Sequence, residues 1–250
     1  MPTTQELAAD LAAAVGSGEL FAVFQPQVSI ATGATVGVEA LCRWRHPRWG
    51  LIPPSDFIPL AEDSGAIDDL GMFMLGESMV AADEWRAAGI VREVSVNVSP
   101  RQLASDAFFE RVAEEFTRRS LEAGALTIEI TESLPVDAGS VLPRLRELRA
   151  LGVGVSLDDY GTGHASIEQL ESLPLTEVKL DGELIRDASA RRALEPLSEI
   201  VELAHERGIR VVAEGIETLA HLESAVALDC DRAQGYLIGE PRPKSRLFET

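Results

Sequence analysis

Short apolar runs alternate with longer amphipathic segments along most of the chain. The first two runs, residues 20–30 and 35–44, are joined only by the turn-like segment 31–34, so we expect an antiparallel hairpin. Further strand-like runs occupy residues 93–99, 126–132, 153–159, 175–181, 209–215 and 230–237. Helical patterns fill the intervals at residues 56–89, 106–124, 141–152, 167–173 and 191–208, with a last helix from about Thr218.

Strands that alternate with helices after an initial hairpin imply a mostly parallel sheet. Eight strand candidates in about 230 residues match a closed (β/α)8 barrel. An open doubly wound sheet is the alternative, although no glycine-rich dinucleotide fingerprint is present. We therefore predict one α/β domain over residues 19–250, a TIM-like (β/α)8 barrel whose first strand is antiparallel to the rest.

Residues 1–18 carry an amphipathic pattern of their own. Thr3 and Glu6 fit a capping box, and Leu7, Leu11 and Val15 repeat at helical spacing before two glycines end the pattern. We expect a short helix that packs on the body of the protein or leads in from a partner domain. The segment has no basic stretch before its apolar residues, which argues against a signal peptide, and no run approaches the length of a transmembrane helix.

Composition places the chain among ordinary globular proteins, with 46% hydrophobic and 25% charged residues. Its net charge of −19 argues against duplex nucleic acid and anionic membranes as partners. The charge also argues against a phosphate ligand unless cations lie between protein and phosphate. Cys42 and Cys230 match no redox or metal motif, so we expect reduced thiols in a cytoplasmic protein.

Acids, amides and one lysine interrupt the apolar pattern near the carboxyl ends of the predicted strands. In a barrel these ends converge on the face where barrel enzymes place their chemistry. Any single one could cap a helix or meet solvent, but seven strands that share the feature favour a common site. The residues are Glu39, Asn97, Glu129, Glu132, Asp158, Asp159, Lys179, Glu214, Glu217 and Gln234.

Oxygen ligands dominate this set, which contains neither histidine nor cysteine. Such a set selects Mg²⁺ or Mn²⁺ over zinc or copper. The acids exceed the needs of one octahedral ion, whereas two ions bridged by a carboxylate would use them and would suit in-line displacement at phosphorus. Asp158 is expected to bridge the ions and Asp159 to reach in from the turn after the strand, with a helix cap as the alternative for Asp159. The ions would also reverse the local charge, which answers the objection to a phosphate ligand.

An ordered set of motifs resembles the EAL-domain cyclic di-GMP phosphodiesterases over residues 19–245, and Glu39-Ala40-Leu41 is the signature that names the family. The resemblance implies a barrel with one reversed strand and a homodimer. It also implies a phosphoric diester hydrolase that converts cyclic di-GMP to linear 5′-pGpG by two-metal in-line attack of a bridging hydroxide, lowering this second messenger in bacterial signalling. The motifs are FQPQVSIATGATVGVEALCRWRHPRWGLIPPSDFIPLAEDSG, VSVNVSPRQL, IEITES, GVGVSLDDYGTG, LPLTEVKLD, VVAEGIET and AQGYLIGEPRP.

The resemblance also implies a role for each matching residue. Two Mg²⁺ or Mn²⁺ ions would be held, the first by Glu39, Asn97, Glu129 and Asp158, and the second by Asp158, Asp159 and Glu214. Lys179 would position or polarise the attacking water. Together with Glu39, Glu214 and Glu217 it makes up the predicted catalytic set.

The nucleotide and the site's surroundings take further residues by the same resemblance. Gln25, Arg43, Asp181 and Gln234 would contact the nucleotide, and a guanidinium such as that of Arg43 suits a phosphate or a guanine edge on its own chemistry. Glu217 and Gln234 would order the site through water and hydrogen bonds. Glu132 would anchor the loop after Asp159, a segment that in this family also touches the dimer partner.

Two positions depart from the family pattern. His164 stands where an aromatic residue is usual, and Glu240 makes the rim more acidic. The alternatives to an active phosphodiesterase are a cyclic di-GMP-binding module without turnover, which usually has lost metal ligands, and a Mg²⁺ barrel enzyme of the enolase kind, which usually adds a capping domain. The chain has no GGDEF-like motif, so we expect a stand-alone enzyme or a part of a longer protein with a sensor or synthase domain.

Overall fold

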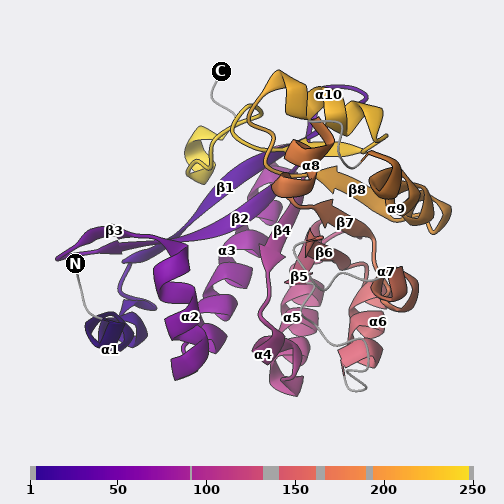
Figure 1. Cartoon of the computed structure of the whole chain (residues 1–250). Helices are drawn as coiled ribbons and strands as arrows, with labels where there is room; N and C mark the ends of the chain where they lie inside the picture. The colour runs from indigo at the N-terminus through magenta and orange to yellow at the C-terminus, as the bar shows by residue number, and fades with distance from the viewer. Residues whose placement is uncertain (1–3, 91, 132–140, 162–166, 190–193, 248–250) are drawn as a thin grey trace.

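The computed structural model describes residues 4–90, 92–131, 141–161, 167–189 and 194–247 (Figure 1). Its strands follow in the order β1-β9-β8-β7-β6-β5-β4-β2-β3, and a further pairing of β1 with β2 closes the sheet into a barrel. The strands are β1 (Leu20–Ser29), β2 (Thr35–His46), β3 (Gly50–Ile52), β4 (Glu93–Asn97), β5 (Leu126–Thr131), β6 (Gly154–Tyr160), β7 (Glu177–Leu180), β8 (Arg210–Ala213) and β9 (Arg232–Gln234).

The direction of the first strand is as predicted. β1 runs antiparallel to both of its neighbours, β2 and β9, while the pairs from β2–β4 through β8–β9 are parallel. The register places Gln25 opposite Glu39 and Gln27 opposite Gln234. The TIM-like barrel with a reversed first strand is thus confirmed.

Helices connect the strands and surround the barrel (Figure 1). Three elements, β3, α4 and α8, were not predicted. β3 and α4 contain only three and four residues, too few to show a periodic pattern. The helices are α1 (Thr4–Ala14), α2 (Pro54–Ser64), α3 (Ile67–Ala87), α4 (Pro100–Leu103), α5 (Asp106–Arg118), α6 (Val141–Leu151), α7 (Ile167–Ser172), α8 (Gly182–Ser189), α9 (Leu194–Glu206) and α10 (Leu219–Ala227), followed by a 3-10 turn at Lys244–Arg246.

Two predicted helices were too long. The segment 56–89 is divided between α2 and α3 because Gly65 adopts a left-handed conformation, with φ of 85°, and ends α2. The segment 106–124 is helical only to Arg118, and Ser120 follows with a positive φ of 52°. A continuous apolar pattern therefore concealed a change of direction in the first case and a C-terminal turn in the second.

α1 packs on the body of the protein. Its Leu7 and Leu11 are buried in the same hydrophobic cluster as Phe57 of α2. Asp10 lies 3.1 Å from Nε2 of His46 at the end of β2. The boundary between residues 1–18 and 19–250 stays a prediction from the sequence pattern.

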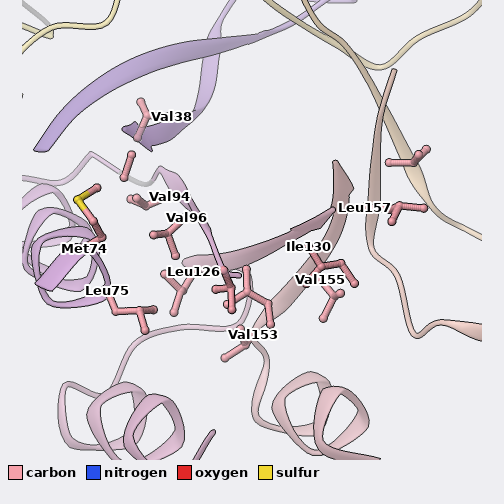
Figure 2. Close-up of a cluster of buried hydrophobic side chains, with 14 of the residues drawn as sticks. Val38, Met74, Leu75, Val94, Val96, Leu126, Ile130, Val153, Val155 and Leu157 are labelled. Carbon is pink, nitrogen blue, oxygen red and sulfur yellow. The ribbon is translucent and has the colours of Figure 1, made fainter. Parts of the chain in front are cut away.

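The parallel strands bury apolar side chains on their outer faces. Val94 and Val96 of β4 lie against Met74 and Leu75 of α3, and Figure 2 shows this contact within a larger buried cluster. Because successive strand residues point to opposite faces, the residues that alternate with these valines, Glu93, Ser95 and Asn97, point into the barrel. There the sequence has polar residues, so the helices cover an apolar surface while the barrel interior is polar.

Among the described residues, no helix combines the length and the apolar character that a membrane span requires.

Candidate active site

The polar strand ends converge on one cavity at the carboxyl end of the barrel. The cavity has a volume of about 380 Å³. Eight of the predicted site residues line it, namely Gln25, Glu39, Asp158, Asp159, Lys179, Glu214, Glu217 and Gln234. Most of the residues predicted as a site from the sequence therefore line one cavity.

Lys179 lies at the centre of the acidic cluster and is only 1% exposed. Its Nζ is 2.7 Å from Glu214 Oε1, 3.0 Å from Asp158 Oδ1, 3.1 Å from Glu129 Oε1 and 3.4 Å from Glu39 Oε2. An ammonium group has three N–H donors and one charge, so it cannot balance four carboxylates. The cluster therefore needs further cations, or protons on some of its carboxylates, to balance its charge.

A β-bulge explains how two adjacent aspartates serve one site. Leu157 pairs with Val178 and Tyr160 pairs with Leu180, so Asp158 and Asp159 together stand opposite the single residue Lys179. Asp159 has a left-handed backbone, with φ of 55°. We expected the chain to leave the strand at Asp159, and that was wrong, because β6 continues to Tyr160. The bulge, and not a terminal turn, brings the second carboxylate to the cavity.

Hydrogen bonds from two amides orient Glu39. Asn97 Nδ2 donates to Glu39 Oε1 at 2.8 Å, and Gln234 Nε2 donates to Glu39 Oε2 at 2.5 Å. With its nitrogen engaged in this way, Asn97 turns its carbonyl oxygen away from Glu39. An amide oxygen in that position suits a hard cation as a ligand.

Burial and neighbouring charges shift the pKa of Glu39, Glu129, Asp159 and Glu214. Burial raises the pKa of Glu214 to about 8 and that of Asp159 to about 6, with the like charge of Asp158 adding to both. Burial and the charge of Glu39 raise the pKa of Glu129 well above its usual value. Glu39 itself differs, since burial raises its pKa but Lys179 and the two amides bring that pKa below its usual value.

Lys179 keeps its charge, as we expected. Burial lowers its pKa, but attraction to Asp158, Glu129, Glu214 and Glu39 outweighs burial and raises the pKa well above its usual value. Without ions, Lys179 is therefore a cation and a hydrogen-bond donor at neutral pH.

The donor set fits two divalent cations. Oxygens of Glu39, Glu129 and Asp158 lie within 4.8 Å of one another, and so do oxygens of Asp158, Asp159 and Glu214. Asp158 belongs to both groups, which is what a bridging ligand requires. Apart from ion pairs with Lys179, both oxygens of Glu129 and Oδ1 of Asp158 are buried without a hydrogen-bond partner among the described residues. These groups suit Mg²⁺ or Mn²⁺.

Arg43 and Asn97 line a second cavity of about 490 Å³ beside the first. Leu41 lines both cavities, so the two adjoin. The second cavity is built largely from apolar residues of α2, α3 and β4, including Ile58, Met74 and Val96. It offers a surface for a flat apolar group next to the acidic cluster.

Asp181 is the predicted nucleotide contact that lies apart from the two cavities. It is half-buried, and its Oδ1 accepts a hydrogen bond of 2.7 Å from the Glu183 backbone, which caps α8. Its charge still contributes to the raised pKa of Asp159. Glu132 lies outside the described residues, as does His164, so their predicted roles stay predictions.

Four residues of the acidic cavity lie outside the predicted site: Leu41, Gly215, Gly235 and Tyr236. Leu41 stands two positions after Glu39 within β2, and the two-residue strand period puts such neighbours on one face, so the strand period could have found it. Tyr236 is 66% exposed at the rim and follows the end of β9 at Gln234, so no strand period could have found it.

Comparison with known proteins identifies the family. The EAL domain model matches residues 8–241. The chain belongs to the EAL domain family. The solved structure of the PaMucR phosphodiesterase in its c-di-GMP complex superimposes on this EAL domain with a TM-score of 0.90 at 38% identity, covering 97% of this chain and 99% of that one.

Two curated relatives come from Pseudomonas aeruginosa. This EAL domain is 37% identical to the cyclic di-GMP phosphodiesterase PA2567 over 96% of the chain and 42% of that protein. It is 32% identical to the cyclic di-GMP phosphodiesterase RocR over 96% of the chain and 62% of that protein. The chain thus spans less than two thirds of the length of either relative.

Proposed function

We propose that this EAL domain is a divalent-cation-dependent phosphodiesterase that hydrolyses cyclic di-GMP to linear 5′-pGpG. One observation carries the proposal: the parallel strand ends and one bulge gather two overlapping groups of carboxylates around Lys179 at one cavity. The names of PA2567, RocR and the PaMucR complex support this choice of substrate.

The proposed ions are two Mg²⁺ or Mn²⁺. The first would be held by Glu39, Asn97, Glu129 and Asp158, and the second by Asp158, Asp159 and Glu214. When bound, such ions polarise a phosphoryl oxygen, lower the pKa of water and neutralise charge during in-line displacement. In their absence the burial of so many like charges is relieved by protonation, as the raised pKa values of Glu214 and Glu129 indicate.

The chain's own residues supply orientation and fixed charge. The Lys179 ammonium lies among Glu129, Asp158 and Glu214, which are proposed ion ligands, so we assign it the positioning of an attacking water held between those groups. Gln234 and Asn97 hold Glu39 in one orientation. Glu217, exposed at the rim, would order water around the site.

The second cavity supports a nucleotide as substrate. Arg43 lines that cavity next to Leu41, and its Nη1 donates to the Cys42 carbonyl at 2.8 Å, which steadies the guanidinium. A base in the apolar cavity could use the remaining donors of Arg43 while its phosphate lies over Lys179. Gln25 of the acidic cavity, and Asp181 near Asp159, are proposed to complete the nucleotide contacts.

The test is incubation of the protein with cyclic di-GMP and Mn²⁺, followed by chromatography for pGpG. We expect product from the natural chain and none from Glu39→Ala, because Glu39 belongs to the proposed ion site. Activity of Glu39→Ala equal to that of the natural chain would contradict the ligand assignment. Binding of cyclic di-GMP without product from the natural chain would instead support a receptor.

We further propose that the protein works as a cytoplasmic homodimer, on the strength of the family resemblance. Light scattering of the protein with and without cyclic di-GMP tests the oligomeric state, and a monomer under both conditions would contradict it. The relatives extend beyond the matched region. A sensor or synthase domain in the same polypeptide is therefore part of this proposal.

A further inference from the structure

A buried chain of hydrogen bonds connects Glu39 with the opposite end of the barrel. Gln234 Nε2 donates to Glu39 Oε2 at 2.5 Å, and Gln27 Nε2 donates to Gln234 Oε1 at 2.9 Å. Arg232 Nη1 in turn donates to Gln27 Oε1 at 3.2 Å. Every side chain of this relay, Glu39, Gln234, Gln27 and Arg232, is at least nine-tenths buried.

The relay has a fixed direction because its two ends have opposite hydrogen-bonding character. A guanidinium only donates and an ionised carboxylate only accepts, whereas each glutamine amide between them does both. Arg232 therefore requires the oxygen of Gln27, which leaves the NH₂ group of Gln27 for Gln234. Gln234 must then present its oxygen to Gln27 and its NH₂ group to Glu39.

A side branch reinforces the same orientation. Gln25 Nε2 donates to the Gly239 carbonyl at 3.1 Å, so the oxygen of Gln25 is left to accept from Gln234 Nε2 at 3.2 Å. Both protons of the Gln234 amide are thus used on acceptors. A reversed Gln234 would set its oxygen against the oxygens of Glu39 and Gln25 and its NH₂ group against that of Gln27.

The far end of the relay is itself held firmly. Arg232 Nη2 donates to Glu93 Oε2 at 2.9 Å, and its Nη1 lies 3.5 Å from Glu177 Oε2. Arg210 contacts the same two carboxylates, with distances of 2.8 Å from Nη2 to Glu93 Oε1 and 2.9 Å from Nε to Glu177 Oε2. Two arginines thus face two glutamates, and Arg232 cannot swing away without leaving a buried charge unpaired.

We propose that Gln27 and Arg232 are positioning residues for the reaction, which fix the amide of Gln234 so that it donates to Glu39. Neither residue lines the acidic cavity, and both act through Gln234. The proposal rests on the proposed function only in taking Glu39 as an ion ligand. Groups that orient a metal ligand typically change metal affinity or activity by about 10- to 100-fold when they are altered.

The matched variants are Gln27→Glu and Gln27→Met. In Gln27→Glu the new carboxylate would keep the acceptor for Arg232 but set an oxygen against Gln234 Oε1 in place of the donor, so the Gln234 amide would be pushed from its place beside Glu39. In Gln27→Met both polar groups are absent, and Gln234 is left to keep donating to Glu39 and Gln25. Gln27→Glu, the variant closer in shape to the natural residue, should therefore lower Mn²⁺ affinity more than Gln27→Met does. A role of Gln27 in packing alone predicts the reverse order.

The first measurement is the affinity for Mn²⁺ alone, taken from the electron paramagnetic resonance signal of the free ion, beside thermal unfolding as a check of the fold. We expect Gln27→Glu to weaken Mn²⁺ binding at least about tenfold and Gln27→Met to weaken it less than about threefold. With cyclic di-GMP, the loss in Gln27→Glu should appear in kcat more than in KM. Equal Mn²⁺ affinity in the two variants, or a greater loss in Gln27→Met, would overturn the proposal.

The second measurement needs neither ion nor turnover. The side-chain amide protons of Gln234, assigned by their disappearance in Gln234→Met, should show the downfield shift of a charge-assisted hydrogen bond in the natural chain and in Gln27→Met. The shift should be lost in Gln27→Glu. A downfield shift that survives in Gln27→Glu overturns the inference. If the natural chain neither binds Mn²⁺ nor hydrolyses cyclic di-GMP, the proposed function is overturned. The amide signal of Gln234 still decides the inference in that case.

Discussion

Asp159 shows at the scale of one residue how the backbone serves the site. Two neighbouring strand residues normally point to opposite faces, so only one of two adjacent aspartates would reach the barrel interior. The bulge opposite Lys179 and the positive φ of Asp159 remove that restriction. Aspartate and asparagine tolerate the left-handed region better than other residues with a side chain. An aspartate at position 159 therefore suits both the backbone conformation and the proposed ion site.

Replacement of Asp159 separates the effect of the backbone conformation from the effect of the charge. Asp159→Asn retains the backbone preference and loses the charge, so we expect Mn²⁺ affinity to fall at least about tenfold while the free energy of unfolding without ions does not fall, because the raised pKa of Asp159 shows that its charge is unfavourable there. Asp159→Val should lose the ion as well and also destabilise the fold by about 1–2 kcal/mol, because a β-branched residue is strained there. Titration calorimetry and urea unfolding measure the two effects. Equal stability of the two variants would contradict the bulge as the cause.

The sequence predicted the membership of the site better than its geometry. Asp158, Lys179 and Gln234 could be found because each breaks an apolar strand near its carboxyl end, and Glu39 because it interrupts the apolar run of β2. The bulge could not be found, since it depends on how β6 pairs with β7, and no local pattern in either strand encodes that register. Asp181 was assigned to the nucleotide from the resemblance, and its local contact with α8 became visible only in the structure.

At the scale of the elements, the connection after β4 shapes the second cavity and the approach to Asn97. Ser99 and Gln102 form a capping box at the start of α4. Gln102 Nε2 also donates to the Ile67 carbonyl of α3 at 3.1 Å. Gly71 of α3 makes room for this side chain, and so the turn after Asn97 is fixed to α3.

A glycine pair within α3 tests this connection. In Gly71→Ala the added Cβ would lie 1.7 Å from Gln102 Nε2, so the amide must leave its place, and we expect a loss of about 1–3 kcal/mol in the free energy of unfolding together with lower affinity for cyclic di-GMP. Gly76→Ala is the control, because nothing lies within 4 Å of its added Cβ. That variant should be stabilised by about 0.5–1 kcal/mol from helix propensity. Chemical denaturation compares the two, and similar effects of both would refute the role of Gln102.

Sequence patterns served long elements well and short ones poorly. α3, α5 and β2 were located because each repeats its apolar period several times, whereas α4 and β3 contain four and three residues. The capping residues of α4 were present in the sequence as Ser99 and Gln102, but they did not stand out without the contact to α3.

At the scale of the whole molecule, part of the excess of acid over base lies where cations are expected. The net charge of −19 argues against a phosphate ligand unless cations lie between protein and phosphate. The structure gathers acids around Lys179 at one end of the barrel, while at the other end Glu93 and Glu177 are balanced by Arg210 and Arg232. The sequence could predict the first group from its strand-end positions. It could not predict the second, whose partners come together only when distant strands meet.

This arrangement predicts a dependence of stability on pH. Without ions, Glu214 and Asp159 have folded-state pKa values of about 8 and about 6, above their ordinary values of 4.5 and 3.8. The stability that their protonation contributes is complete below the ordinary values and is lost as pH rises through the folded ones. Mg²⁺ requires the deprotonated groups, so it should raise the unfolding temperature more at about pH 8 than at about pH 6.

Calorimetric scans with and without Mg²⁺ at both pH values provide this measurement. Glu214→Gln, which cannot titrate at that position, is the control, and its pH dependence should be flatter than that of the natural chain. A rise in unfolding temperature that is the same at the two pH values, or larger at the lower one, would count against the link between protons and ions.

The most direct test of the central claim is hydrolysis of cyclic di-GMP in water enriched in ¹⁸O, in the presence of Mn²⁺, with mass spectrometry of the product. The account predicts linear pGpG that carries one heavy oxygen on its terminal phosphate, because water attacks phosphorus in line and the ribose oxygen leaves. Intact cyclic di-GMP after prolonged incubation, or pGpG without the heavy oxygen, would contradict it.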